Sequence, residues 1–177
     1  LPVDVKLARM LVAAKQHDSL QEMIVIAAFM GIADPRERPA DAKQAADTAH
    51  RQFADSGSEF LAVIRLWRAY RQMHEELSQS QLRKWCERNF LSYLRMREWR
   101  ELHRQLLITA RELQWPLPEW PDIEARLEAA AQDTKAAARH YQQIHRAVLA
   151  GLPTQIGHKN DKGLYDGPRQ RRFAIFP

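Results

Sequence analysis

Residues 78–115 read SQSQLRKWCERNFLSYLRMREWRELHRQLLITARELQW, a stretch without proline or glycine that ends at Pro116. Ser78 followed by Gln81 is the pattern of an N-terminal capping box. Apolar residues then recur at steps of three or four, which predicts one long helix, or two nearly continuous helices, with an apolar stripe. The stripe consists of Leu82, Cys86, Phe90, Tyr93, Met96, Trp99, Leu102, Leu106, Ala110 and Leu113.

The same stretch is strongly basic outside its apolar stripe. On a continuous helix, Lys84, Arg88 and Arg95 share one line with Leu91. Further cations follow at Arg97, Arg100, Arg104 and Arg111. The usual origin of such a pattern is the solvated face of a core helix, and the alternative is a track for the phosphates of a nucleic acid.

Segment 85–106, WCERNFLSYLRMREWRELHRQL, resembles the WCxxNFLxxRxLxxAxxIRxQL signature in the helicase-associated region of DEAH-box RNA helicases. Its portion 94–99 is closer to the bacterial HrpA type than to the eukaryotic splicing helicases. Other segments resemble the same family in the same order. They are PVDVKLARML (2–11), DPRERP (34–39), DSGSEFLAVIRLWRAY (55–70), IHRAVLAGL (144–152) and YDGPRQRRFAIFP (165–177). The chain departs from the family at Val5, where the pattern has proline, and over 114–140, where the family has a shorter connection.

The resemblance implies a division of the chain into three parts. Residues 1–17 would be the tail of a winged-helix domain and its linker, 18–151 a helical ratchet-like domain, and 152–177 the first strands of an OB-fold. An OB-fold needs five strands, so this one would be incomplete. The expected fold class is therefore mainly α, a helical bundle with a short β-containing C-terminal tail.

Periodicity along the chain predicts the other helices. Residues 1–14 form a short amphipathic pattern, and 20–30 are apolar on nearly all sides, as in a buried helix. Residues 41–53 predict a mostly polar helix. Capping boxes are predicted at Ser19 with Glu22 and at Ser56 with Glu59. Over 122–150 the apolar residues predict a single amphipathic helix of about seven turns.

The composition excludes several classes of protein. The 177 residues are 45% apolar, with no glycine between positions 57 and 151, as in a mostly helical globular protein. One cysteine excludes a disulfide framework and favours a reduced compartment. There is no signal peptide and no apolar run long enough to cross a bilayer, so we expect a cytoplasmic protein without a membrane partner. The net charge of +5 favours an acidic partner such as RNA or DNA.

The chain shows no catalytic constellation. It lacks the G-x-x-x-x-G-K-S/T loop that cradles nucleotide phosphates, and it lacks the Asp-Glu-Ala-His box. His140 and His145 are five residues apart without further ligands, which argues against zinc. We therefore expect no cofactor in this chain. The resemblance implies that two RecA-like motor domains, which bind ATP and Mg²⁺, lie N-terminal to Leu1.

The resemblance implies an accessory region that guides single-stranded RNA past the motor domains. The motor domains of the same chain would then be partners of this region. The candidate RNA-binding residues are Lys84, Arg88, Arg95, Arg97, Arg169, Arg171 and Arg172. The last three cluster beside Phe173, a pattern typical of nucleic-acid binding or of a charged hairpin edge. The alternatives are a helical protein–protein interaction scaffold and a helical DNA-binding module, although no recognition helix can be identified.

Overall fold

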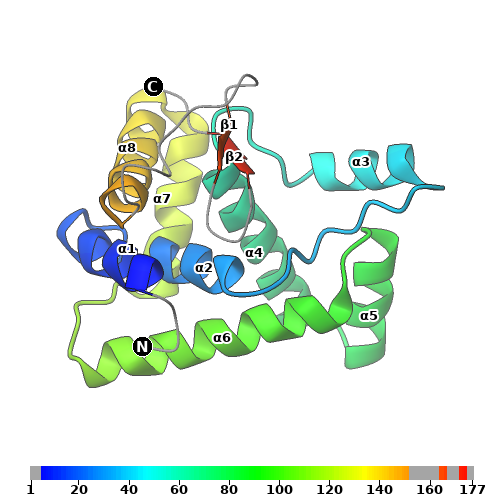
Figure 1. Ribbon diagram of the computed structural model, residues 1–177, viewed down its shortest axis with the longest axis horizontal. Helices are drawn as coiled ribbons and strands as arrows, with labels where there is room; N and C mark the ends of the chain where they lie inside the picture. Colours follow the sequence, from blue (N-terminus) through cyan, green and yellow to red (C-terminus); the bar gives the residue numbers. More distant parts are fainter. Residues whose placement is uncertain (1–4, 152–163, 167–171, 175–177) are drawn as a thin grey trace.

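The computed structural model describes residues 5–151, 164–166 and 172–174. In these ranges the protein is mainly helical, as predicted (Figure 1). The helices are α1 (Val5–Gln16), α2 (Leu20–Met30), α3 (Lys43–Arg51), α4 (Glu59–Glu76), α5 (Gln79–Arg88), α6 (Tyr93–Glu112), α7 (Trp120–Gln132) and α8 (Thr134–Gly151). Two short strands follow, β1 (Leu164–Asp166) and β2 (Arg172–Ala174).

Helix α2 is the centre of the bundle. Each of its residues is buried, which confirms the prediction made from its apolar composition. It packs against α1, α4, α6, α7 and α8, and Figure 1 shows it lying between α6 and the α1–α8 side of the molecule. A helix that is apolar on all sides needs neighbours on all sides, and the amphipathic helices around it supply them.

Trp99, on α6, packs against both α2 and α4. Its side chain is fully buried, and its indole Nε1 donates a hydrogen bond to the backbone oxygen of Val25, 3.0 Å away. The ring contacts Phe29 edge-on at a centroid distance of 5.1 Å and Trp67 at 4.9 Å. Aromatic pairs at such distances stabilise a core beyond the area they bury.

Residues 78–115 do not form one helix or two nearly continuous ones. Helix α5 ends at Arg88, α6 begins at Tyr93, and the two axes diverge sharply (Figure 1). Phe90 adopts the left-handed conformation with φ of 52°, and the Leu91 amide donates to the Cys86 oxygen at 2.9 Å. This is the Schellman ending of a helix, formed here without the usual glycine. Periodicity did not predict the break because buried residues recur at helical spacing on both sides of it.

The predicted single helix over 122–150 is also wrong. It is interrupted at Asp133, whose φ and ψ of −133° and 121° are those of an extended residue. The Asp133 carboxylate accepts a hydrogen bond from the Lys135 amide at 3.1 Å, so this residue ends α7 and caps the start of α8. The two helices pack against each other as a hairpin.

The three predicted capping boxes have different outcomes. The box of Ser78 and Gln81 is confirmed, with both reciprocal hydrogen bonds present. The box at Ser19 is wrong, because Ser19 makes no capping bond and the buried Glu22 contacts His140 instead. The start of α4 is capped by Ser58, two residues after the predicted serine.

The C-terminal strands form an antiparallel pair in which Tyr165 lies opposite Phe173. The remaining tail residues lie outside the described ranges, so the OB-fold stays a prediction.

The domain boundaries stay a prediction as well. Helix α1 packs along α8 and shares the hydrophobic core with the rest of the bundle.

Candidate nucleic-acid interface

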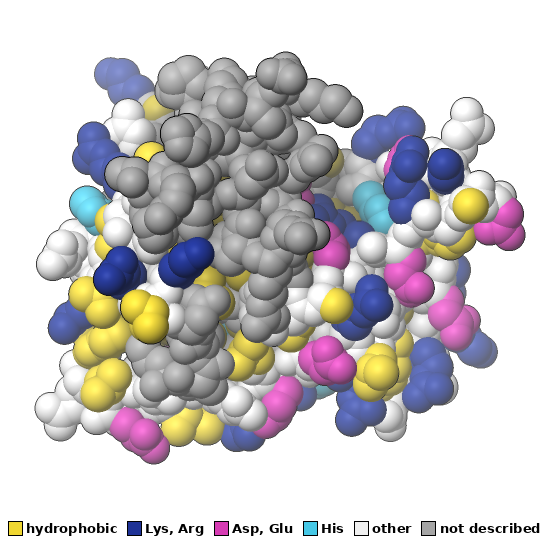
Figure 2. All heavy atoms as spheres, viewed as in Figure 1, with side chains coloured by type: hydrophobic (Ala, Val, Ile, Leu, Met, Phe, Trp, Pro, Cys, Tyr) yellow, Lys and Arg dark blue, Asp and Glu magenta, His cyan; other side chains and the backbone are white. Residues whose placement is uncertain are grey.

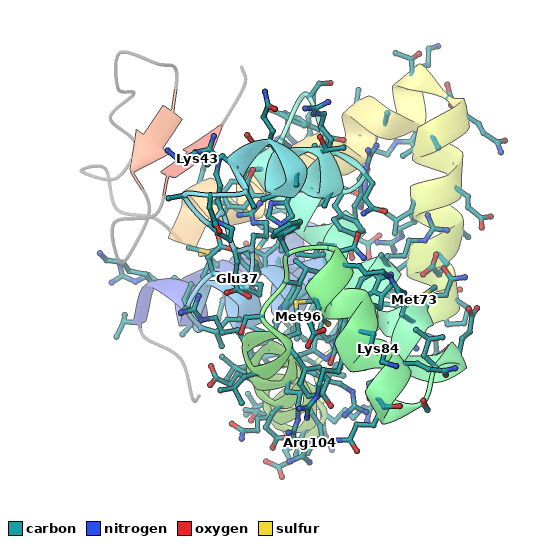
Figure 3. The ribbon with its side chains drawn as sticks, turned by 90° about the vertical axis from the view of Figure 1, so that its right-hand side faces the viewer. Glu37, Lys43, Met73, Lys84, Met96 and Arg104 are labelled. Atoms are coloured by element: carbon teal, nitrogen blue, oxygen red, sulfur yellow. The ribbon has the colours of Figure 1, made fainter. Side chains whose placement is uncertain are left out.

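The turn between α5 and α6 is fixed by the loop that contains Asp34 to Pro39. The Glu37 amide donates to the Phe90 oxygen at 2.8 Å, and the Ser92 amide donates to the Pro35 oxygen at 2.7 Å. Figure 3 shows Glu37 and Met96 beside this turn, with Lys84 on α5. Two segments that resemble the same helicase family, 34–39 and 85–106, therefore meet in space. We call the surface made by α5, this turn and the adjoining end of α6 the α5–α6 corner.

The predicted basic line does not exist as one helix face. Lys84 and Arg88 are exposed on α5, whereas Arg95 and Arg97 are exposed on α6. Leu91, which was expected to complete the line, is buried with 2% of its surface exposed. The turn therefore brings cations from two helices to the α5–α6 corner.

Arg95 is held in place by the supporting loop. Its Nη1 donates to the Asp34 backbone oxygen at 3.0 Å, while the Asp34 carboxylate accepts from Arg36 at 2.8 Å. Arg36 also pairs with Glu59 at 2.6 Å, which joins the loop to the start of α4. The prolines and charges of this loop thus position a candidate RNA-binding arginine, a role that the sequence did not indicate.

Tyr93 adds an aromatic group to the corner. Its half-buried ring lies 4.8 Å from the Arg83 guanidinium and 5.8 Å from that of Arg97. Cations over an aromatic ring are attracted by its negative face. Arg83 was not among the predicted site residues. The feature of the sequence that could have identified Arg83 is its position next to Lys84, one turn after the capping box.

Positive charge continues along α6 but is partly neutralised. Arg104 pairs with Glu101 at 2.6 Å, and this hydrogen bond lowers the pKa of Glu101 to about 2, so that the carboxylate stays ionised at neutral pH. Arg100 and Arg111 form no ion pair with any residue in the described ranges. Figure 2 shows Lys and Arg side chains gathered over α5 and the near end of α6, with acidic side chains among them.

The sequence profile described as helicase associated domain (HA2), ratchet-like, matches residues 4–92. This match covers α1 to α5 and includes the loop that supports the α5–α6 corner. The chain belongs to the HA2 family. The HA2 assignment agrees with the mainly helical architecture, and the resemblance to helicase-associated regions is confirmed.

Two relatives of this HA2 chain match it over its whole length. The ATP-dependent RNA helicase HrpA homolog of Haemophilus influenzae is 40% identical over 178 aligned positions. The ATP-dependent RNA helicase HrpA of Escherichia coli is 39% identical over 178 positions. In both cases the chain spans 12% of the relative's length.

The other predicted site residues lie in the tail. Arg169 and Arg171 are outside the described residues. Arg172 begins β2, but its side chain is outside the described part as well. The structure therefore places Lys84 and Arg88 on α5 and Arg95 and Arg97 on α6, all exposed, and leaves the RNA-binding role of these residues and of the tail arginines as a prediction.

Groups that resemble catalytic residues in this HA2 chain are structural. The Ser58 hydroxyl lies 2.7 Å from the His145 Nε2, but both residues are buried, and the same hydroxyl caps α4. Burial raises the pKa of the Cys86 thiol to about 11, so it is not a nucleophile at neutral pH.

Within the described ranges no group of histidine, cysteine and acidic residues could hold a metal ion. No helix in those ranges is long and apolar enough to span a bilayer.

Proposed function

We propose that this chain is an accessory RNA-binding region of an ATP-dependent RNA helicase of the HrpA type. Support comes from the identity of 39–40% to two proteins named as RNA helicases, which extends over the whole chain. The observation that carries the RNA-binding role is the α5–α6 corner, where Lys84, Arg88 and Arg95 are exposed. The half-buried Tyr93 ring of the same corner lies beside Arg83 and Arg97.

The chemistry of the corner suits contact with the RNA backbone. Lysine and arginine side chains neutralise phosphates and carry no base information directly. The corner is built on two helices that are joined by a turn hydrogen-bonded to the 34–39 loop, so the backbone positions that carry the cations are fixed relative to one another. In this proposal the surface follows a single strand without selecting its sequence.

The rest of the helicase supplies the motor. RecA-like domains N-terminal to Leu1 would bind ATP with Mg²⁺ and contact this region, and residues 152–177 would begin an OB-fold. The arginines of the tail, Arg169, Arg171 and Arg172, would extend the RNA surface. The cytoplasmic location expected for such a helicase belongs to the same proposal.

The test is the binding of a single-stranded RNA oligonucleotide at several salt concentrations. Each phosphate contact with a single strand contributes about 0.7 to the slope of log K against log salt concentration. Replacing Lys84, Arg88 and Arg95 by alanine should therefore weaken binding and reduce the slope by about 2. The reduction should be the same for oligonucleotides of different sequence.

A matched control removes the same charge elsewhere. Lys135, Arg139 and Arg146 are exposed on α8 and form no ion pair with a described residue. Their triple alanine variant should keep most of the RNA affinity. Equal loss in both variants would mean that only net charge matters. A folded corner variant with unchanged affinity and slope would refute the assignment and favour the protein-interaction scaffold.

A further inference from the structure

The C-terminal end of α3 is attached to the α5–α6 corner by hydrogen bonds. The His50 Nε2 lies 3.0 Å from the backbone oxygen of Phe90, in the turn between α5 and α6. The Gln52 side-chain amide donates to the Asn89 side-chain oxygen at 2.5 Å, just after the end of α5. A third helix is therefore fixed beside the corner, and none of its side chains was among the candidate RNA-binding residues.

Trp85 lies at this junction between α3 and α5. Its ring meets the Phe53 ring at a centroid distance of 6.2 Å and an angle of 63°. Phe53 is buried, whereas Trp85 is only half-buried, so part of the indole is open to solvent. The Asn89 amide donates to the Trp85 backbone oxygen at 2.8 Å. An aromatic ring that is anchored on one side and accessible on another suits the stacking of a nucleobase.

Three exposed cations border the indole of Trp85. Lys84 and Arg88 are on α5, and Arg51 is the last residue of α3. Lys84 precedes Trp85 by one residue and Arg88 follows it by three, so both lie within about 100° of it around the helix axis. None of the three cations forms an ion pair with a described residue. Basic side chains beside an accessible aromatic ring are typical of surfaces that bind single strands.

The acidic side chains near the junction leave this charge in place. Asp47, on α3, is paired with Arg38 at 2.8 Å. Glu87 follows Trp85 by two residues and therefore lies about 160° away from it around α5. Figure 3 shows Glu37 on the side of the turn away from Lys84. The positive charge beside the indole is thus available to a phosphate.

We propose that Trp85 is a stacking platform for one base of the RNA strand and that Arg51 contacts a phosphate next to that base. This inference rests on the proposed function, because the cations of the α5–α6 corner bring the strand to the indole. Phosphate contacts release counterions and weaken with salt, whereas a stacked base contributes affinity with little dependence on salt. Every base has a π face, so the platform accepts any base and the surface stays without sequence preference.

The experiment compares two strands of equal length, one single-stranded oligoribonucleotide and one abasic strand with the same ribose-phosphate backbone. Trp85→Leu keeps an apolar side chain against Phe53 but removes the aromatic face. It should weaken binding of the base-bearing strand about 5- to 100-fold at an unchanged salt slope, and should leave binding of the abasic strand nearly unchanged. Trp85→Phe, which keeps an aromatic face, should retain most of the affinity.

Arg51→Gln should act differently from Trp85→Leu. It should lower the slope of log K against log salt concentration by about 0.7, and equally for both strands, because only a phosphate contact is lost. The matched controls are Trp115→Leu, a half-buried tryptophan with Lys15 over its ring, and Arg139→Gln on the exposed face of α8. Both controls should leave the binding of both strands unchanged. Circular dichroism checks the fold of each variant.

The outcomes separate this inference from the proposed function. If Trp85→Leu has no effect, or weakens both strands equally, the platform is refuted, while a loss of affinity in the Lys84, Arg88 and Arg95 variant still supports the corner. If Trp85→Leu does not fold, equal affinity of the unmodified protein for the two strands refutes the platform instead. Binding of neither strand to the unmodified protein would overturn both proposals.

Discussion

Gly151→Ala should destabilise the protein by driving α1 away from α8. A Cβ atom on Gly151 would lie 2.6 Å from the backbone nitrogen and 2.7 Å from the Cα of Met10. Ordinary contact begins at 3.4 Å, so the two helices must separate by about 0.8 Å (3.4 − 2.6). The obstacle is backbone, which cannot rotate away as a side chain can.

The magnitude follows from two opposing effects. Overpacking of a close helix contact costs about 1–3 kcal/mol. Alanine recovers about 0.5–1 kcal/mol because it is less flexible than glycine in the unfolded chain. The expected net loss is about 1–2 kcal/mol in the free energy of unfolding, or roughly 2–8 °C in Tm for a domain of this size.

Urea denaturation followed by far-ultraviolet circular dichroism measures this change, and two other glycines serve as controls. At Gly57 a Cβ would meet only an Asp55 oxygen at 3.4 Å, so Gly57→Ala should be nearly neutral. At Gly31 it would lie 2.5 Å from the end of the flexible Leu102 side chain, which can move, so Gly31→Ala should be intermediate. The reasoning is refuted if Gly151→Ala is no more destabilising than Gly57→Ala.

Three further predictions concern single side chains. Gln114 is exposed with φ of 56°, so Gln114→Gly should relieve left-handed strain and raise the free energy of unfolding by about 0.5–1 kcal/mol. A lower urea midpoint than that of the unmodified protein would contradict this. Trp99→Phe removes the hydrogen bond to Val25 and part of a fully buried ring, and should lower the free energy of unfolding by about 1–3 kcal/mol at an unchanged m-value. A change below about 0.5 kcal/mol would be inconsistent with the buried position of the Trp99 ring. Burial lowers the pKa of His145 to about 4, so the unfolded chain binds this proton before the folded protein does as the pH falls. The free energy of unfolding should therefore drop between about pH 6.5 and 4, by up to about 1.4 kcal/mol per pH unit. His145→Gln should flatten that pH dependence, and an identical slope in the variant would exclude His145 as its source.

The sequence by itself determined the helical class and most of the buried residues, although Leu113 of the predicted apolar stripe is 51% exposed. Local periodicity and capping chemistry are properties of neighbouring residues, so α2 could be predicted as a core helix and Ser78 as a cap. The resemblance to helicase-associated regions also rests on contiguous motifs. The basic character of α5 and α6 was evident for the same reason.

Only the tertiary structure decided where the helices bend and which groups meet. Phe90 takes a left-handed conformation because the loop at Glu37 and the burial of Leu91 hold the turn, and neither cause is local in sequence. The bend moves Arg95 from a predicted helical line with Lys84 to the other helix of a corner. The hollow that residues of α4 and α6 line together was likewise unpredictable, since the two helices come together through their packing on α2. Periodicity records which side of a helix is buried, whereas the partner on that side is set by packing across the whole chain.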